Sequence, residues 1–299
     1  MTTNLQKARY NTPELIIQST ARIECTFSNG KRSTGTSFFY RYSGKDYNYP
    51  VLVTNRHVIK DKDYGPSIEG KCILSKKDVA GNRLHHQQIP VGFHGYTDGW
   101  IPHPDEKVDL CILPLAPWFE IMQEKDIDPF VVCNDTSSMP TKEQWDSLSP
   151  LEKITMIGYP DGLWDEVNNL PIARIGHTAT AANIDYNGRR EFLIDAAVYP
   201  GSSGSPVYLF EESIKLNKSE KESTISQRTR LHLLGIASAV RTQNWDGTIE
   251  LREIPIARMP ISVTAIPINL GVVIKSTRLV EFEPVLRRLD PDNPENKKK

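Results

Sequence analysis

Three residue types that can together activate a nucleophile occur in this chain, each beside an apolar run. Ser203 lies in the stretch PGSSGSP, between glycines at positions 201 and 204. A serine hydroxyl attacks a carbonyl efficiently only when a base takes its proton, and a neutral imidazole does so when an acceptor fixes its other nitrogen. His57 could supply this imidazole and Asp109 this acceptor. The set predicts acyl transfer through a covalent acyl-enzyme.

The glycines around the serine suggest how the transition state would be stabilised. Gly201 and Gly204 let the backbone turn where a side chain would collide, so successive N–H groups can converge on one point. Convergent donors of this kind form an oxyanion hole. Taken alone, however, a GxSG sequence is typical of any tight turn, because Gly and Ser are common turn residues. Its interpretation therefore depends on His57 and Asp109.

Other histidines and one other aspartate compete for the roles of base and acceptor. Asp105 lies in a loop beside Pro104 and Glu106, where a solvated carboxylate needs no partner. Asp109 instead precedes the apolar run 110–113, and burying a charge there is costly unless a partner compensates it. The remaining histidines lie in polar turns or inside strand-like runs, which is typical of surface or core positions: His85, His86, His94, His103, His177 and His232.

Short apolar runs rich in β-branched and aromatic residues must position these side chains. We expect strands over 16–27, 34–42, 51–54, 71–74, 88–93, 154–158, 171–182, 191–198, 231–240 and 260–266, with a turn at Asn29-Gly30. Helices are expected over 118–124, after a capping box at Thr141–Gln144, and from Pro267 through Leu279, since proline favours the first helical position.

Composition narrows the class of protein. The chain has 299 residues, 38% of them apolar, and 21 prolines, as expected for a globular protein with many short strands. Its formal charge of −1 gives no global attraction to nucleic acid or an anionic membrane. The N-terminal stretch has no apolar segment typical of a signal or membrane anchor. Four widely spaced cysteines show no metal-binding spacing, so we expect reduced thiols, no metal or other cofactor, and a cytoplasmic location.

Several motifs resemble those of one protease family. The segments TNRHV, VDLCIL and DAAVYPGSSGSPV resemble the three motifs of chymotrypsin-fold, trypsin-like serine proteases. Within that family they most resemble the HtrA/Deg branch, without its PDZ domain. The similarity extends through TGTSFFY, IGYP, LLGIASAV and AIPINLGVVI, from about residue 30 to residue 279. It implies an all-β fold of two perpendicular six-stranded β-barrels with a C-terminal helix. The implied substrate is a polypeptide, bound in the cleft between the barrels.

The resemblance also implies a domain layout. A peptidase unit would cover residues 1–285, with an N-terminal barrel over about 15–125, a linker over 126–150, and a C-terminal barrel and helix over 151–285. Residues 286–299 would form a disordered tail. The charge-rich segment Glu211–Arg230 is expected to be a solvated loop between strands, since it shows little periodicity.

Site roles beyond the triad also follow from the resemblance. The N–H groups of Gly201 and Ser203 would form the oxyanion hole. The S1 pocket would be walled by Ala197, Ile236, Ala237 and Ser238. With Ala197 near the pocket floor, where trypsin-type enzymes carry an acid, we expect a small or medium apolar P1 residue. Ser205 stands where glycine is usual, which leaves open whether the oxyanion hole is formed at rest.

Two other functions fit parts of the sequence. A peptide-binding pseudoprotease would keep the cleft without turnover, or would stay latent until a regulatory protein partner activates it. An α/β-hydrolase esterase would place its residues in the order serine, acid, histidine, with a GxSxG elbow. Here the order is histidine, aspartate, serine, which favours the peptidase.

Overall fold

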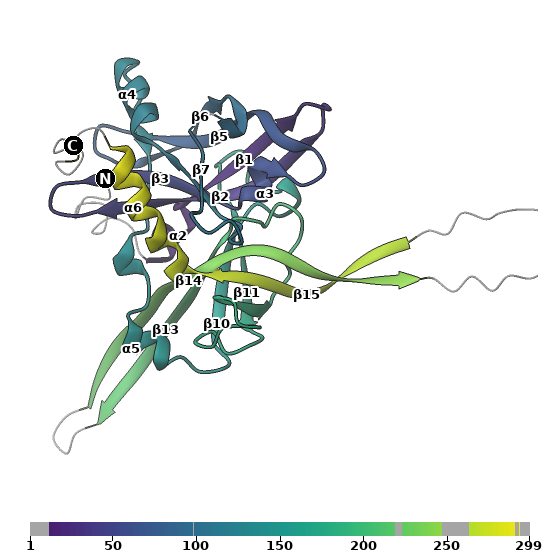
Figure 1. The fold of residues 1–299 in the computed structure, drawn as a ribbon. Helices are drawn as coiled ribbons and strands as arrows, with labels where there is room; N and C mark the ends of the chain where they lie inside the picture. The colour runs from purple at the N-terminus through teal and green to yellow at the C-terminus, as the bar shows by residue number, and fades with distance from the viewer. Residues whose placement is uncertain (1–11, 98, 219–222, 247–262, 291–292, 294–299) are drawn as a thin grey trace, which may run out of the picture.

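The computed structural model describes residues 12–97, 99–218, 223–246, 263–290 and 293. Strands form two units, which Figure 1 shows one above the other. The C-terminal unit is a closed barrel of six strands. In barrel order these are β10 (Lys153–Gly158), β11 (Ile172–Thr178), β12 (Glu191–Asp195), β15 (Val263–Lys275), β14 (Ser223–Asp246) and β13 (Pro206–Lys218).

The N-terminal unit is a curled antiparallel sheet of nine strands. Its main path runs through β4 (Lys60–Asp61), β5 (Gly65–Lys77), β1 (Thr20–Phe27), β2 (Arg32–Ser43), β3 (Asn48–Thr54), β8 (Cys111–Pro114) and β7 (Ile101–Pro102). The strands β6 (Arg83–Phe93) and β9 (Pro129–Phe130) pair with β5. The predicted all-β, chymotrypsin-like architecture is confirmed. Only the C-terminal unit is a closed six-stranded barrel, and the N-terminal unit is this curled nine-stranded sheet in place of the expected second barrel.

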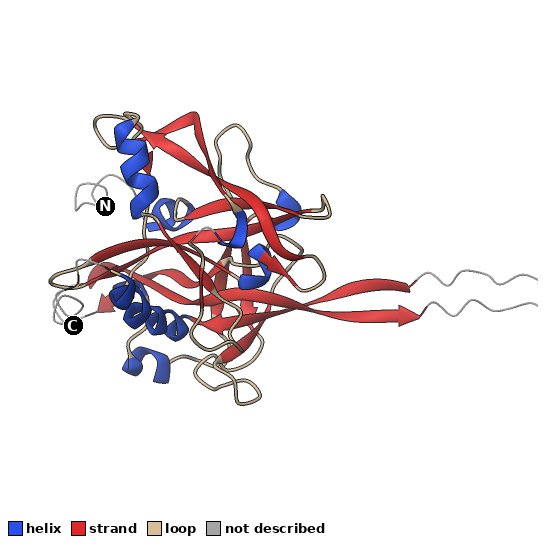
Figure 2. Ribbon diagram, turned by 45° about the horizontal axis from the view of Figure 1, so that its top comes forward, coloured by secondary structure: helices blue, strands red, loops and turns tan. Residues whose placement is uncertain are grey.

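Helices are short and lie around the sheets, as Figure 2 shows. The α-helices are α2 (Thr12–Ile17), α3 (Arg56–Ile59), α4 (Ala116–Glu124), α5 (Lys142–Asp146) and α6 (Glu283–Leu289). The 3-10 helices are η1 (Gly95–Thr97), η2 (Thr136–Ser138), η3 (Pro160–Gly162) and η4 (Ser276–Phe282). The capping box expected before α5 is present, with Thr141 Oγ1 accepting from the Gln144 amide and the Gln144 side chain accepting from the Thr141 amide.

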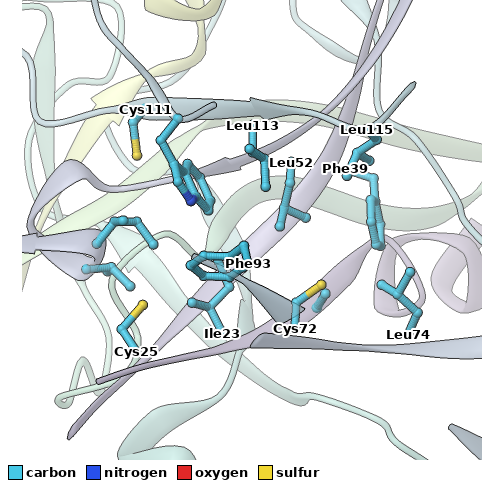
Figure 3. Close-up of a cluster of buried hydrophobic side chains, with 14 of the residues drawn as sticks. Ile23, Cys25, Phe39, Leu52, Cys72, Leu74, Phe93, Cys111, Leu113 and Leu115 are labelled. Atoms are coloured by element: carbon cyan, nitrogen blue, oxygen red, sulfur yellow. The ribbon is translucent and has the colours of Figure 1, made fainter. Parts of the chain in front are cut away.

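Three groups of buried apolar side chains hold the fold together. One fills the curled N-terminal sheet, and Figure 3 shows Phe39, Leu52 and Phe93 within it. Another fills the C-terminal barrel around Phe192 and Ile194. The third contains residues of both units, such as Tyr40, Ile157 and Ile236, so the two sheets share a core. Each such side chain contributes about 1.5–3 kcal/mol when it is fully buried. The shared core fixes one unit against the other.

Two sequence predictions about the C-terminal unit are wrong. Residues 267–275 belong to strand β15, and helical structure begins only at Ser276. Pro267 fits into this strand because the β14–β15 register shifts there, and proline is tolerated at such irregularities. The segment Glu211–Arg230 is not a loop but a hairpin, paired from Glu211↔Arg230 to Lys218↔Ser223. Its residues 211–213 are exposed, so the strand extends past the barrel wall and loses the alternation of a half-buried strand.

Smaller differences concern the ends of the two units. The first predicted strand begins at Thr20 rather than at residue 16, because Thr12–Ile17 form α2. The expected linker 126–150 contains β9, η2 and α5. Helix α6 continues to Leu289, beyond the expected end of the ordered unit at residue 285. Most of the predicted tail lies outside the described residues.

Candidate active site

The turn that carries Ser203 connects β12 to β13. The Ser202 amide donates to the Tyr199 carbonyl at 3.0 Å, and the Ser205 amide donates to the Ser202 carbonyl at 3.0 Å. Gly204 has φ +87°, and a Cβ there would lie 1.9 Å from the Thr36 carbonyl oxygen. Glycine is therefore required at this position by both its backbone angle and the close approach of β2.

His57 and Asp109 come from the ends of two paired strands. His57 lies in α3, directly after β3, and Asp109 lies just before β8, whose first residue pairs with the last residue of β3. The His57 Nδ1 is 2.5 Å from Asp109 Oδ2, and the His57 amide donates to Asp109 Oδ1 at 3.0 Å. The side chain of Asn55 donates to the Asp109 carbonyl at 2.7 Å. These bonds fix the imidazole relative to the carboxylate.

The imidazole also contacts the serine. His57 Nε2 lies 2.8 Å from Ser203 Oγ. Because the Asp109 carboxylate can only accept, Nδ1 carries the proton in this pair, and Nε2 is left to accept from the hydroxyl. The side chains of His57 and Asp109 are 42% and 29% exposed, so the base is reachable from solvent. The arrangement can remove a proton from Ser203 and later return it to a leaving group.

Ser238, which we expected in a pocket wall, also contacts the predicted acid. Its hydroxyl donates to Asp109 Oδ2 at 3.0 Å. A shift in the β14–β15 register falls between Ala237 and Ala239, at this residue. Asp109 thus receives bonds from the His57 amide, the His57 ring and Ser238, and such charge-assisted bonds are stronger than neutral ones. No sequence motif predicts the contact between Ser238 and Asp109, because the two residues are 129 positions apart.

Two carbonyl groups that flank the serine turn accept hydrogen bonds from protein amides. The Pro200 carbonyl accepts from the Asp161 amide at 2.6 Å, and the Ser202 carbonyl accepts from Ser205. In a planar trans peptide the N–H points opposite to the C=O, so the following amides face the other way. Those amides belong to Gly201 and Ser203, and within the described part of the chain neither donates to a protein acceptor. Both remain available to an oxyanion.

The other predicted pocket residues are largely enclosed. Ile236 and Ala237 are buried, one in the core shared by the two sheets and one inside the barrel. Ala197 is partly exposed, and its carbonyl accepts from Arg174 Nη1. The Arg174 guanidinium also lies 4.7 Å from the ring centre of Tyr199. Burial lowers the pKa of Arg174, but it stays charged, so a positive charge lies beside Ala197.

The rival acid has a different environment. Asp105 pairs with Arg278 at 2.6 Å. A hydrogen bond from the Lys107 amide lowers the pKa of Asp105 most, and the bond from Arg278 lowers it further. Asp105 is therefore an ion-pair partner rather than the unpaired solvated carboxylate expected from the sequence. Two of the rival histidines, His103 and His232, have their pKa lowered mainly by burial. Across the described ranges, no group of His, Cys, Asp and Glu residues could hold a metal ion.

The fold and this constellation define a trypsin-like hydrolase of peptide bonds. A family model described as a trypsin-like peptidase domain matches residues 35–213, which include His57, Asp109 and Ser203. This match covers more than half of the chain, and the chain belongs to that family. The protein is a serine endopeptidase that acts on polypeptide substrates. No helix of the described residues is long and apolar enough to cross a membrane.

Several solved structures are similar to this chain at low sequence identity. The active form of the Rv3671c protease from Mycobacterium tuberculosis shares 13% identity over 90% of this chain and 80% of its own, with a TM-score of 0.42. Deg5 shares 18% identity over 79% and 88%, with a TM-score of 0.41. The tobacco vein mottling virus protease shares 12% identity over 89% and 80%, with a TM-score of 0.43. No curated protein matches the chain.

Proposed function

We propose that the peptidase works through His57, Asp109 and Ser203. His57 Nε2 takes the hydroxyl proton as Ser203 Oγ attacks the scissile carbonyl, and Asp109 stabilises the imidazolium that forms. His57 then donates the proton to the leaving amine, and an acyl-enzyme remains on Ser203. Water, deprotonated by His57, hydrolyses this ester. The observation that carries the proposal is the continuous chain of contacts, 2.5 Å between Asp109 and His57 and 2.8 Å between His57 and Ser203.

The amides of Gly201 and Ser203 are proposed to bind the oxyanion. Their support is the anchoring of the Pro200 and Ser202 carbonyls on the opposite side of the turn. Preorganised donors of this kind need no rearrangement when charge develops on the substrate oxygen, and one such donor contributes about 10²- to 10³-fold to kcat. This supports a hole that is formed at rest, despite the serine at position 205.

The proposed P1 preference is for a small or medium apolar side chain, next to Ala197. The charge of Arg174 beside Ala197 adds a reason against Arg or Lys at P1, since like charges repel. Cleavage of a peptide library measures the preference. A profile dominated by Arg or Lys would contradict the proposed preference. A profile dominated by Asp or Glu would also contradict it, and would assign Arg174 as the group that binds the P1 side chain.

The proposed setting is the cytoplasm, with a peptidase unit whose N-terminal sheet spans about 15–125 and whose C-terminal barrel and helix span 151–285. All four cysteines are free, which supports a reducing compartment. We propose no nucleic-acid ligand, since the formal charge is −1. If the isolated chain proves latent, we propose that a regulatory protein partner activates it.

Labelling with a fluorophosphonate and the library assay together test this function. We expect a stoichiometric adduct on Ser203 and peptide cleavage by the wild-type chain. Ser203→Ala should abolish the adduct and lower kcat by about 10⁶-fold, the loss seen when a triad nucleophile is removed. Unchanged cleavage by Ser203→Ala would refute the mechanism. Peptide binding without an adduct or cleavage, under any condition, would instead favour the pseudoprotease.

A further inference from the structure

Thr36 lies in β2 of the N-terminal sheet, yet it contacts the serine turn through two groups, its amide and its hydroxyl. Its amide donates to the Ser203 carbonyl at 2.9 Å, and its hydroxyl donates to the Gly201 carbonyl at 2.9 Å. The same hydroxyl accepts from the Tyr159 amide at 3.0 Å. Thr36 is fully buried, so water does not compete for these bonds.

The hydroxyl of Thr36 bridges two loops of the C-terminal barrel. Tyr159 begins the turn η3, whose Asp161 amide holds the Pro200 carbonyl, while Gly201 lies in the serine turn itself. A hydroxyl that accepts from one loop and donates to the other fixes the distance between them. The two loops lie close together, because a Cβ on Gly201 would lie 2.5 Å from the Tyr159 carbonyl oxygen.

Both ends of the peptide between Gly201 and Ser202 are therefore occupied. Thr36 binds its carbonyl, and the Tyr199 carbonyl accepts its N–H. Displacement of this peptide would break both bonds and would shift the Cα of Gly201, and the Gly201 N–H, the proposed oxyanion donor, is attached through its nitrogen to that Cα. The bond from Thr36 opposes such a displacement from outside the turn.

We propose that Thr36 is a positioning residue, whose hydroxyl fixes the place of Gly201, and so of its amide, in the oxyanion hole. The inference rests on the proposed function of that hole. It makes the hole depend on how the two units dock, since Thr36 belongs to the N-terminal sheet and Gly201 to the turn between two strands of the C-terminal barrel. Thr36 touches neither the substrate nor the reacting atoms, and it acts through the peptide it holds.

Three variants of Thr36 separate the hydroxyl from packing. Thr36→Ala and Thr36→Val both remove the hydroxyl, and Val keeps the side-chain volume. Thr36→Ser keeps the hydroxyl and loses only a methyl group. The matched control is Ser37→Ala on the same strand, which removes an equally buried hydroxyl bonded to the Ala21 carbonyl at 2.8 Å, away from the turn. Thermal unfolding followed by circular dichroism shows which variants are folded.

Steady-state kinetics on a cleavable peptide and affinity for a peptide boronic acid are the readouts. In Thr36→Ala and Thr36→Val, kcat should fall about 10- to 100-fold with KM nearly unchanged, because the lost interaction acts in the transition state. Affinity for the boronic acid, whose adduct on Ser203 mimics the tetrahedral intermediate, should fall in parallel. Thr36→Ser should retain most activity, and Ser37→Ala should keep kcat within about twofold of wild type.

The outcomes distinguish this inference from the function it rests on. A folded Thr36→Ala with wild-type kcat, or an equal loss in Ser37→Ala, would overturn the role of Thr36 alone. A loss confined to KM would also overturn it. Absence of both turnover and fluorophosphonate labelling in the wild-type chain would overturn the proposed function instead. If Thr36→Val fails to fold, the comparison of Thr36→Ala with Thr36→Ser still decides.

Discussion

Gly201→Ala should abolish most activity while leaving the fold in place. Gly201 has φ +83°, which costs an alanine about 1–2 kcal/mol. In addition, the new Cβ would lie 2.5 Å from the Tyr159 carbonyl oxygen and 3.1 Å from the Asp161 amide nitrogen. Both are backbone atoms and cannot rotate away. Ordinary contact begins at 3.4 Å, so the turn must move by roughly 0.9 Å, and a displacement of about 1 Å can cost 10²-fold in rate.

The matched control is Gly188→Ala. Gly188 has φ +72°, but a Cβ there would meet nothing within 4 Å. Both variants should lose about 1–2 kcal/mol of stability from the backbone angle, and Gly201→Ala should lose more because of its clash, as measured by urea unfolding. Only Gly201→Ala should lose about 10²- to 10³-fold in kcat, the contribution of one oxyanion donor. Activity of Gly201→Ala within twofold of wild type, or an equal loss in Gly188→Ala, would refute the reasoning.

Three further predictions concern other parts of the chain. Ser238→Ala removes one bond to Asp109, which costs about 1.4 kcal/mol and should lower kcat about tenfold at unchanged KM in the peptide assay. Burial raises the pKa of the Cys25 thiol to about 12 and raises that of Cys72 as well, so both should resist Ellman's reagent until urea unfolds the chain. Burial lowers the pKa of His103 below 6.5, so the native state resists its protonation; the free energy of unfolding should fall as pH drops below about 6.5, and His103→Gln should weaken that dependence.

The residues that lie next to apolar runs could be located from the sequence. His57, Asp109 and Ser203 each stand where a buried strand begins or ends, and a polar residue at such a place needs an explanation. The structure brings their side chains within hydrogen-bonding distance of one another. Several strands of the barrel were also predictable from their alternating or fully apolar runs, whereas their closure into a barrel was implied only by the family resemblance. Local pattern and motif together were sufficient for this much.

The contacts that hold the turn could not be predicted in this way. Thr36 meets Gly201 across 165 positions, and Ser238 meets Asp109 across 129. Ser, Thr and Asn are common in strands and turns, so their type gives no sign of a partner so far along the chain. The hairpin of β13 and β14 was missed for a related reason. The outer part of the hairpin is stabilised by strand pairing. Alternation of apolar and polar residues identifies a strand only where one face packs against a core, so it gives no signal there.

Ser205 stands where glycine is usual, and the structure accommodates it through another glycine. A Cβ on Gly158 would lie 2.0 Å from Ser205 Oγ, so the hydroxymethyl group occupies space that a side chain at position 158 would fill. The backbone of Ser205 keeps its place, since its amide donates to Ser202 and its carbonyl accepts from Ala237 at 2.9 Å. Serine in place of glycine at position 205 therefore adds a side chain on the side of the turn away from the oxyanion hole. The peptide bonds that face the hole are unchanged. The place of the proposed Gly201 donor is set instead by two contacts: Thr36 of the N-terminal sheet holds the Gly201 carbonyl, and the Asp161 amide of η3 holds the Pro200 carbonyl.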